Sequence, residues 1–441
     1  LISGFSVGRE GPSVHMGATG ASILADKLHL PHNAMRTLSG CGVAAGIAAS
    51  FNTPLAAVIF VMEVVLREYK VHIFVPIMLA ALTGALATQF VFGEGSELAL
   101  ISITPLSGWH YPYLILCGMA LGAIAYSFNQ NLMLIIKTFK PLSMFPRLLI
   151  AGCIASIIAY AVPQAMGSGM SAITIAVESP ENAQLLTTIL IAKLLATLFA
   201  IGLGIPGGLI GPVIGLGVLT GTLMAFFAQF ISPGADIAGT YGVLGMAGLL
   251  AATLHAPLAA LTTVMELTSS PEIIVPAMLV ITTAYVTALQ VFGNRSIFLQ
   301  QLDFQGLPYH VSPATEALQK VGIMDDMDED FKLLYSDDKE QIKNTLDAMD
   351  SQTPLIVYDE ENGYRLAEYD LTLMSGENIN INYISLQGIS SQSTLADAFD
   401  ILKDKRSGAL YVYNLLDDQQ IMGLLRWDQI NNILTIRNSL L

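Results

Sequence analysis

Two short stretches of the chain combine groups that could bind and release an anion. Gly8-Arg9-Glu10-Gly11-Pro12 places an ionisable carboxylate beside helix-breaking residues, and Gly208-Leu209-Ile210-Gly211-Pro212 repeats the glycines and the proline two hundred residues later. A helix that starts at such a break presents unpaired N–H groups and partial positive charge, so it binds an anion without a full cation. The pair of stretches therefore predicts an anion site at two helix starts.

Glu10 is the ionisable member of this pair, and Ile210 is its counterpart. A charged residue within a membrane segment is costly and usually functional. An ionised carboxylate would compete with the anion for its site, and protonation would release it, which makes a gate. The alternatives are that Glu10 is a structural partner of Arg9 and that the glycines only allow close helix packing.

The elements that must position these residues are apolar segments with internal breaks. Such segments recur at about 34–66, 71–92, 112–137, 146–163, 183–203, 207–231, 240–268 and 273–292. Several can span ~30 Å of hydrocarbon. Glycine and proline breaks are tolerated at membrane depth where protein or a water-filled cavity satisfies the freed backbone groups. The pattern predicts an all-α polytopic membrane protein built as a compact bundle of short, broken helices.

A second internal repeat supports the first. Residues 42–63 align with residues 245–266 at a constant shift of 203, with Pro54 opposite Pro257 and Glu63 opposite Glu266. Gly/Pro-interrupted segments in corresponding places of two halves are the best sequence pointer to a transporter's binding site. We therefore expect residues 1–302 to hold most of two homologous halves. The chain begins at Leu1 without Met, and we expect an N-terminal part to precede it.

Charge separates a membrane domain from an acidic domain. Residues 1–302 hold 10 Lys/Arg and 11 Asp/Glu, a net of −1, whereas residues 303–441 hold 10 and 24, a net of −14. The acidic balance argues against nucleic-acid binding. The histidines form no metal motif, and Gly202 to Gly207 fits GxGxxG without the strand that a dinucleotide site requires. We predict no metal site and no enzymatic activity.

The tail predicts alternating strands and helices in two similar copies. Leu355–Tyr358 and Leu410–Tyr413 are expected strands, each followed by a turn, a second strand and a helix start. Segments 341–350 and 393–405 are expected helices, with Thr394 as an N-cap.

Taken together, the Gly8–Pro12 stretch, Asn52-Thr53-Pro54-Leu55-Ala56 and Gly204–Pro212 resemble the CLC family of chloride channels and chloride/proton exchangers. The resemblance implies an inverted-repeat fold and a homodimer with one pore per subunit. It implies that Glu10 is the gating glutamate and that the amides of Leu209 and Ile210 line the central anion site. The residues expected to bind the anion are Arg9, Glu10, Gly11, Gly208, Leu209, Ile210 and Phe298.

Three departures from the family pattern bear on mechanism. The family's serine-bearing Gly-Ser-Gly-Ile-Pro stretch would lie upstream of Leu1. Phe298 stands where a tyrosine usually closes the inner side of the anion site. Exchangers often have two acidic residues after the Asn-x-Pro motif, and here they read Glu63-Val64. Glu63 is a candidate for the proton path, or else a helix-end carboxylate near Arg67 at i+4.

The tail resembles a pair of CBS modules, roughly 307–374 and 384–438. Such pairs can bind adenine nucleotides, with an Asp near the helix start holding the ribose, and Asp370 and Asp428 match that place. The hydroxyl residue three positions earlier is replaced by Ala367 and Leu425. A structural, dimerising module is the alternative.

The leading hypothesis is a chloride channel-like CLC pathway gated by Glu10. The alternatives are a proton-coupled chloride antiporter and, from another class, a nucleotide-sensing regulatory membrane protein. The expected surroundings are a lipid bilayer, with the membrane domain in the cell inner membrane and the tail in the cytosol. Chloride and similar anions are the expected ligands.

Overall fold

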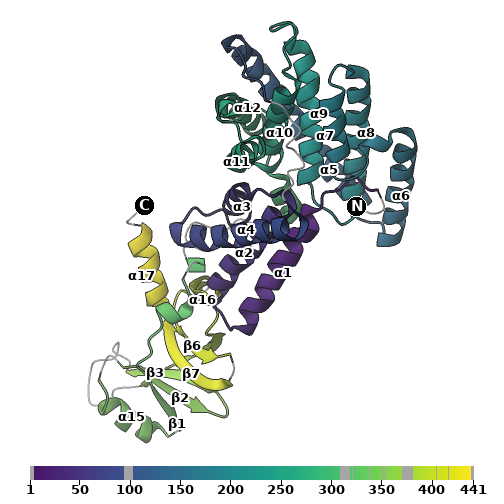
Figure 1. Ribbon diagram of the computed structural model, residues 1–441. Helices are drawn as coiled ribbons and strands as arrows, with labels where there is room; N and C mark the ends of the chain where they lie inside the picture. Colours follow the sequence, from purple (N-terminus) through teal and green to yellow (C-terminus); the bar gives the residue numbers. More distant parts are fainter. Residues whose placement is uncertain are drawn as a thin grey trace. The chain divides into compact units, whose positions relative to one another are not determined.

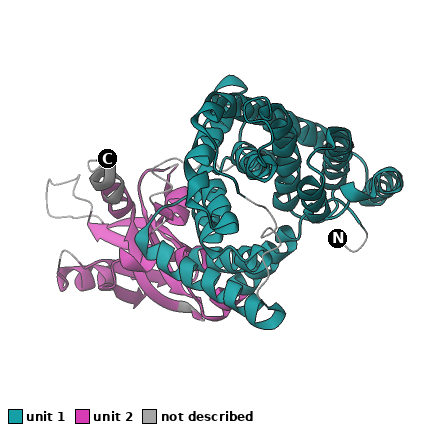
Figure 2. Cartoon of the chain, turned by 45° about the horizontal axis from the view of Figure 1, so that its top comes forward, with its two compact units in different colours: residues 1–22, 37–309 teal, residues 23–36, 310–441 magenta. Residues whose placement is uncertain are grey.

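The structure is a computed structural model. It describes residues 4–93, 103–307, 318–319, 321–336, 338–350, 353–369, 381–403, 405–415 and 417–438. The chain divides into two compact units, shown in Figure 2. Unit 1 comprises residues 1–22 and 37–309, and unit 2 comprises residues 23–36 and 310–441. The boundary between residues 302 and 303 that the change in charge suggested stays a prediction.

Unit 1 is built from helices, many of them short or interrupted (Figure 1). Residues 23–36, at the adjoining ends of the first two helices, group with unit 2. The helices, with the π-helical turns η1 and η5 and the 3₁₀ turns η2, η3 and η4, are α1 (Glu10–Lys27), α2 (His32–Phe51), α3 (Pro54–Phe60), η1 (Val61–Leu66), α4 (Val71–Phe92), η2 (Gly108–His110), α5 (Tyr111–Phe139), α6 (Met144–Ala161), η3 (Pro163–Ala165), α7 (Met170–Glu178), α8 (Ala183–Gly202), α9 (Ile210–Ala228), α10 (Ala238–Leu254), α11 (Pro257–Thr268), η4 (Pro271–Ile273), α12 (Ile274–Val286), η5 (Thr287–Val291) and α13 (Ile297–Phe304).

The two longest expected apolar segments are each split at the same point of the repeat. Asn52 separates α2 from α3 and His255 separates α10 from α11, and both residues have left-handed backbones, with φ of 56° and 59°. Each break is followed by a proline, Pro54 or Pro257, which favours the first turn of a new helix because its missing N–H is not needed there. The structure thus bears out the repeat at a shift of 203.

The two halves of unit 1 meet through reciprocal contacts. The amide of Gly8 donates to the carbonyl of Gly208 at 2.8 Å, and the amide of Gly208 donates to the carbonyl of Gly8 at 2.9 Å. Contacts in which one residue meets its counterpart in both directions are typical of an approximate two-fold relation. The Gly-x-x-Gly-Pro stretches, and with them the starts of α1 and α9, therefore lie beside each other.

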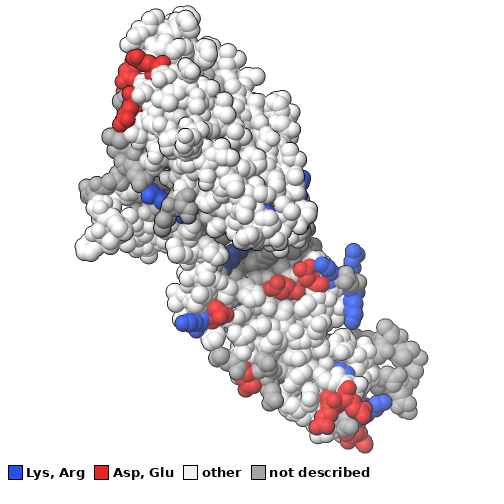
Figure 3. Space-filling model, turned by 90° about the vertical axis from the view of Figure 1, so that its right-hand side faces the viewer, with Lys and Arg blue, Asp and Glu red and all other residues white. Residues whose placement is uncertain are grey.

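Six helices of the described residues are long and apolar enough to cross a membrane. They are the segments Val71–Phe92, Gly108–Phe139, Met144–Ala161, Ala183–Gly202, Ile210–Ala228 and Pro271–Val291. α9 and α10 are the most buried and pack through backbone-to-backbone approaches such as Gly217 against Gly245. α4 and α6 instead expose large apolar side chains, including Phe90 and Tyr160. Figure 3 shows a face of the helical unit that has few charged side chains, as expected for a surface in lipid.

Unit 2 contains two small sheets with similar topology. In each sheet the first two strands are parallel and are separated in sequence by a helix, and the third strand pairs antiparallel with the second. The first sheet has a fourth strand, β4, which pairs antiparallel with the third. The sheet orders are β1-β2-β3-β4 and β5-β6-β7. The elements, with the 3₁₀ turn η6, are η6 (Ile323–Asp325), β1 (Lys332–Tyr335), α15 (Lys339–Asp347), β2 (Leu355–Asp359), β3 (Gly363–Tyr369), β4 (Ile381–Ser385), β5 (Gln387–Ser390), α16 (Leu395–Leu402), β6 (Ala409–Asn414), β7 (Asp417–Arg426) and α17 (Trp427–Asn438).

The expected strands of the tail and its helices at 341–350 and 393–405 are confirmed, as is the helix start after β7. The helix start expected after β3, near Asp370, lies outside the described residues. Thr394 is the N-cap of α16 in a capping box with Asp397: the Thr394 amide donates to the Asp397 carboxylate at 2.7 Å. Such a box satisfies backbone donors at the helix start in both directions. The repeated topology is compatible with a pair of CBS-like modules.

Candidate functional site

The carboxylate of Glu10 lies at the N-terminus of α9. Glu10 opens α1, and its Oε1 accepts a hydrogen bond of 2.9 Å from the backbone N–H of Gly211 in the first turn of α9. The Ile210 amide also faces this carboxylate. Glu10 is 2% exposed, and its Oε2 has no hydrogen-bond partner among the described residues. A negative group thus occupies the helix start that the sequence assigned to an anion.

Glycine at two positions lets the two helix starts approach this closely. A Cβ atom on Gly208 would collide with the Glu10 side chain, and a Cβ on Gly11 would lie 2.8 Å from the Gly208 nitrogen. Either side chain would push the carboxylate or the backbone out of place. The glycines therefore leave room for the carboxylate, or for an anion in its place, besides allowing close packing.

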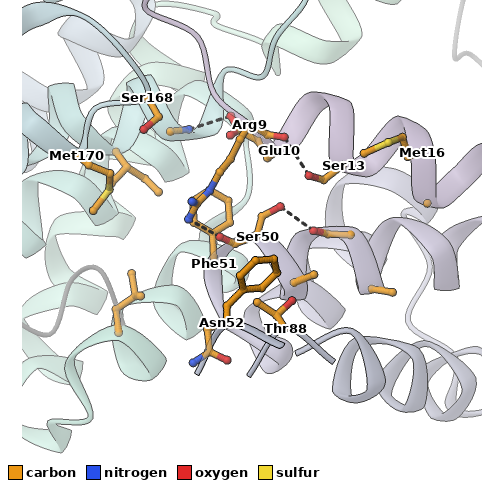
Figure 4. A pocket seen from close by; sticks show the side chains of 18 of the residues that line it. Arg9, Glu10, Ser13, Met16, Ser50, Phe51, Asn52, Thr88, Ser168 and Met170 are labelled. Carbon is orange, nitrogen blue, oxygen red and sulfur yellow. Dashed lines mark hydrogen bonds between the residues drawn. The ribbon is translucent and has the colours of Figure 1, made fainter. Parts of the chain in front are cut away.

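Arg9 contacts residues at the end of α2 besides acting on Glu10. Its Nη2 donates to the carbonyl of Ser50 at 2.5 Å, and its guanidinium lies 5.9 Å from the centre of the Phe51 ring. Figure 4 shows these side chains from close by. Its charge also acts on the Glu10 carboxylate, and the alternative in which Glu10 is a structural partner of Arg9 stays a prediction. Arg9 brings positive charge to the wall of the adjoining cavity.

Two cavities of unit 1 meet at Glu10. The first has a volume of about 890 Å³, and its lining includes Arg9, Ser50 and Asn52 (Figure 4). The second has a volume of about 400 Å³, and its lining includes Gly11 and Gly208. Among the described residues, Glu10 is the one that lines both. The Glu10 side chain therefore lies at the boundary of both spaces.

The second cavity collects most of the residues that the sequence singled out. Its lining includes Glu10, Gly11, Glu63, Val64, Gly208, Leu209, Ile210 and Phe298. Phe298 packs edge-on against Phe60, with ring centres 6.5 Å apart. Phe298 supplies no hydroxyl, whereas Ser296, which also lines the cavity, brings one nearby. The structure thus brings these candidates together, and their roles in binding stay predictions.

Glu63 has partners that the sequence did not reveal. Its two carboxylate oxygens accept hydrogen bonds from the amides of Leu258 at 3.2 Å and Ala259 at 2.8 Å, in the first turn of α11. The sequence weighed a proton role against a local pairing with Arg67. The structure adds hydrogen bonds to a helix start in the other half of the unit, and both interpretations of Glu63 stay predictions.

Glu266 makes the matching contact in the opposite direction. Its carboxylate accepts hydrogen bonds from the amides of Leu55 and Ala56, both at 2.8 Å, at the start of α3. Carboxylates are favourable at helix N-termini because they face unpaired N–H groups and the positive end of the helix dipole. Sequence reasoning missed this exchange, although the alignment of Glu63 with Glu266 was the signal.

Sequence reasoning also passed over His255, which lines the second cavity. Its Nε2 is buried without a hydrogen-bond partner in the described parts of the chain. Its ring packs edge-on against Tyr285, with centres 5.2 Å apart. The internal repeat could have drawn attention to His255, because the shift of 203 sets it opposite Asn52 of the Asn-x-Pro motif.

Lys193 on α8 is a second residue that the sequence analysis overlooked. It is fully buried, and its Nζ lies 3.3 Å from Ser6 Oγ and from the carbonyls of Ala165 and Gly167. A Cβ on Gly215 of α9 would lie 3.0 Å from the lysine Cε. A cation held against α9 adds positive potential near the helix start that receives Glu10.

The nucleotide candidates of unit 2 are only partly described. Asp428 is exposed in the first turn of α17, and Asp370 lies outside the described residues. Ala367 and Leu425 are buried in β3 and β7. Within the described ranges, no group of three or more His, Cys, Asp or Glu residues could hold a metal ion.

Comparison with known proteins places this geometry in a family. The family of voltage-gated chloride channels matches residues 1–289. A ClcB-like chloride channel protein of Ralstonia nicotianae is 32% identical over 315 residues, covering 68% of this chain and 72% of that protein. The H(+)/Cl(−) exchange transporter ClcA of Citrobacter koseri is 32% identical over 316 residues, covering 68% of this chain. The match spans 65% of that transporter, slightly under two thirds of its length.

Solved structures agree on the fold. The crystal structure of a slow cyanobacterial Cl⁻/H⁺ antiporter has a TM-score of 0.63 at 23% identity, covering 69% of this chain and 72% of that chain. The crystal structure of a eukaryotic CLC transporter has a TM-score of 0.58 at 19% identity, covering 97% of this chain and 77% of that chain. This chain is an integral membrane protein with the mostly helical CLC transporter fold, and it belongs to the voltage-gated chloride channel (CLC) family.

Proposed function

We propose that the protein exchanges chloride for protons across a membrane, with Glu10 both gating the anion path and carrying the proton. The observation that supports this most is the carboxylate of Glu10 on the Gly211 amide, between two cavities. An anion that passes from one cavity to the other needs the same helix start. Chloride and the ionised carboxylate therefore exclude each other.

This proposal replaces the channel-like hypothesis as the leading one. The apolar Val64 favoured uncoupled flux because an apolar side chain cannot relay a proton. Relatives at 30–32% identity are named H(+)/Cl(−) exchange transporters, which supports the antiporter alternative instead. The Val64 argument excludes only one route for the proton, since other titratable residues line the second cavity.

The chemistry follows from electrostatics at the α9 start. When Glu10 is ionised, it satisfies the Gly211 N–H and closes the path. When a proton neutralises the carboxylate, the helix start attracts it less, and chloride can take its place. The protonated carboxyl then releases its proton to the water of one cavity, and the ionised carboxylate that remains returns to the Gly211 N–H and displaces the anion. Each cycle thus links anion movement to proton movement.

The proposal extends to the assembly of the whole protein. It has two inverted halves, in keeping with the reciprocal Gly8–Gly208 and Glu63–Glu266 contacts, and it works as a homodimer with one path per subunit. Unit 2 is a CBS-like pair in the cytosol, and the membrane is the cell inner membrane. An adenine nucleotide is a candidate ligand of unit 2, through Asp370 and Asp428.

The test records chloride efflux and proton uptake together from liposomes that contain the complete protein or its Glu10→Gln variant. We expect wild-type chloride flux to rise as pH falls, because protonation opens the gate. Glu10→Gln should keep chloride flux, lose its pH dependence and lose proton uptake, since an amide neither closes the path by charge nor carries a proton.

Chloride flux in the variant serves as the control for folding and insertion. If Glu10→Gln retained the wild-type pH profile, or still moved protons with chloride, Glu10 would not be the gate and the proposal would be wrong.

A further inference from the structure

The second cavity must supply or receive the proton of Glu10 on one side of the gate. Its titratable lining comprises Glu10, Glu63, Arg67 and His255. An arginine stays protonated in proteins and cannot relay a proton. Glu63 already accepts backbone hydrogen bonds on both of its oxygens, from Leu258 and Ala259. Protonating Glu63 would weaken the start of α11, so Glu63 is poorly suited to a relay.

Unlike Glu63, His255 has a side-chain atom without a hydrogen bond among the described residues, its Nε2. Its Nε2 is buried and has no hydrogen-bond partner among the described residues, which is uncommon for a buried polar atom. The left-handed backbone at φ of 59° fixes the residue at the break between α10 and α11. The edge of Tyr285 holds the ring from the side. Nε2 is therefore free to accept a proton or to donate one.

The charged surroundings of His255 come from several elements. Arg67, at the end of η1, and Arg295, ahead of α13, carry positive charge that opposes a proton on the imidazole and favours its release. Glu63 and Glu10 bring negative charge to the same cavity. A volume of about 400 Å³ holds several water molecules, at ~30 Å³ for each. Water can thus connect Nε2 with the unpartnered Oε2 of Glu10.

We propose that His255 is the proton-transfer residue of the second cavity, passing protons between the water of that cavity and Glu10. The inference rests on the proposed function and identifies the residue that exchanges protons with Glu10. In the transfer toward Glu10, an N–H bond of the imidazolium breaks and an O–H bond forms on the carboxylate through intervening water. The ring returns to its neutral form and takes its next proton from the cavity water.

The repeat itself suggests the test substitution. Asn52 occupies the equivalent break with the same left-handed backbone, so His255→Asn keeps a residue type suited to that conformation and removes the titratable ring. Reconstituted His255→Asn should keep chloride flux, and its proton movement per chloride should fall at least about a hundredfold, the lower end of the loss expected when a positioned acid–base group is removed. His255→Glu should recover proton movement with a different pH profile, which a purely structural role for the ring would not produce.

The controls separate this inference from the proposed function. If the wild-type protein moves no protons against their gradient, the proposed function fails. If the wild type does so and His255→Asn does so equally well, His255 is not the transfer residue. Chloride flux in the same liposomes reports folding, and His255→Gln is measured in the same way should His255→Asn be inactive. Glu272→Gln, at an exposed carboxylate of η4, is the matched control and should keep its proton-to-chloride ratio. Loss of proton movement in Glu63→Gln but not in His255→Asn would assign the transfer to Glu63 and contradict the inference.

Discussion

The proposed anion path depends on a contact between Glu10 and a helix start that has no side chain at position 208. The Glu10 carboxylate reaches the Gly211 amide across the space that a Gly208 side chain would fill. An anion bound to the same amide would use this space too. Gly208, which has no side chain, is therefore as important for the site as Glu10, which carries the charge.

We expect Gly208→Ala to weaken chloride binding about tenfold, equivalent to ~1.4 kcal/mol. The new methyl group would crowd the helix start that receives the anion. Calorimetric titration with chloride measures the affinity, and it should be done in the Glu10→Gln background so that no carboxylate competes.

Gly152→Ala is the matched control, because a Cβ at this position of α6 meets no atom within 4 Å. It should leave the affinity unchanged. Equal chloride affinities for Gly208→Ala and Gly152→Ala would move the anion site elsewhere.

At the scale of elements, two carboxylates connect the halves of unit 1. Glu63, in η1 after α3, caps α11, and Glu266, in α11, caps α3. Both α3 and α11 begin with proline, which has no N–H group. The first N–H groups that need a partner are therefore those of the two residues after the proline, and these donate to the glutamate carboxylates. The exchange holds α3 and α11 together beside the second cavity.

Each of Glu63→Gln and Glu266→Gln should lower the free energy of unfolding by about 1 kcal/mol, the usual value of a helix N-cap. The amide loses the negative charge that favours a helix start and turns an N–H group toward N–H donors. Thermal unfolding in detergent compares the variants.

Glu272→Gln supplies the control, because Glu272 is an exposed carboxylate in η4 without a described hydrogen bond. Glu63→Gln and Glu266→Gln should have similar effects because they are related by the repeat. A Glu266→Gln protein as stable as Glu272→Gln would contradict the capping role.

Local pattern was sufficient for much of the helical layout. The expected segment 71–92 coincides with α4, since its apolar run ends at Gly93. The Asn-x-Pro and His-x-Pro breaks follow from the absence of an N–H on proline. α7, by contrast, was not expected, because nine residues are too few for a clear apolar segment.

Partners distant in sequence were beyond local reasoning. Glu63 and Ala259 lie 196 positions apart, and periodicity reports only neighbours within a few turns, which is why Arg67 at i+4 was considered. The repeat was the information that could have bridged this distance. It sets Glu63 opposite Glu266, and a two-fold relation makes a contact of one residue recur at its counterpart, as the amides at the starts of α11 and α3 show.

At the scale of the whole molecule, a nearly neutral helical unit is followed by an acidic one with two similar sheets. The family match ends at residue 289 within the helical unit, whereas similarity in fold to a eukaryotic CLC transporter covers 97% of the chain. The path for the anion and the groups proposed for the proton all lie in unit 1. Coupling should therefore be a property of that unit.

The central claim is that chloride and proton movement are coupled, and the zero-flux voltage for protons tests it most directly. The complete protein is reconstituted in liposomes, a chloride gradient is imposed, and valinomycin with graded potassium sets the voltage while pH is recorded. Coupled exchange predicts proton movement against the proton gradient, with a zero-flux voltage that shifts when the chloride gradient is changed. A zero-flux voltage fixed by the proton gradient alone, with chloride flux intact, would contradict the account and favour an uncoupled channel.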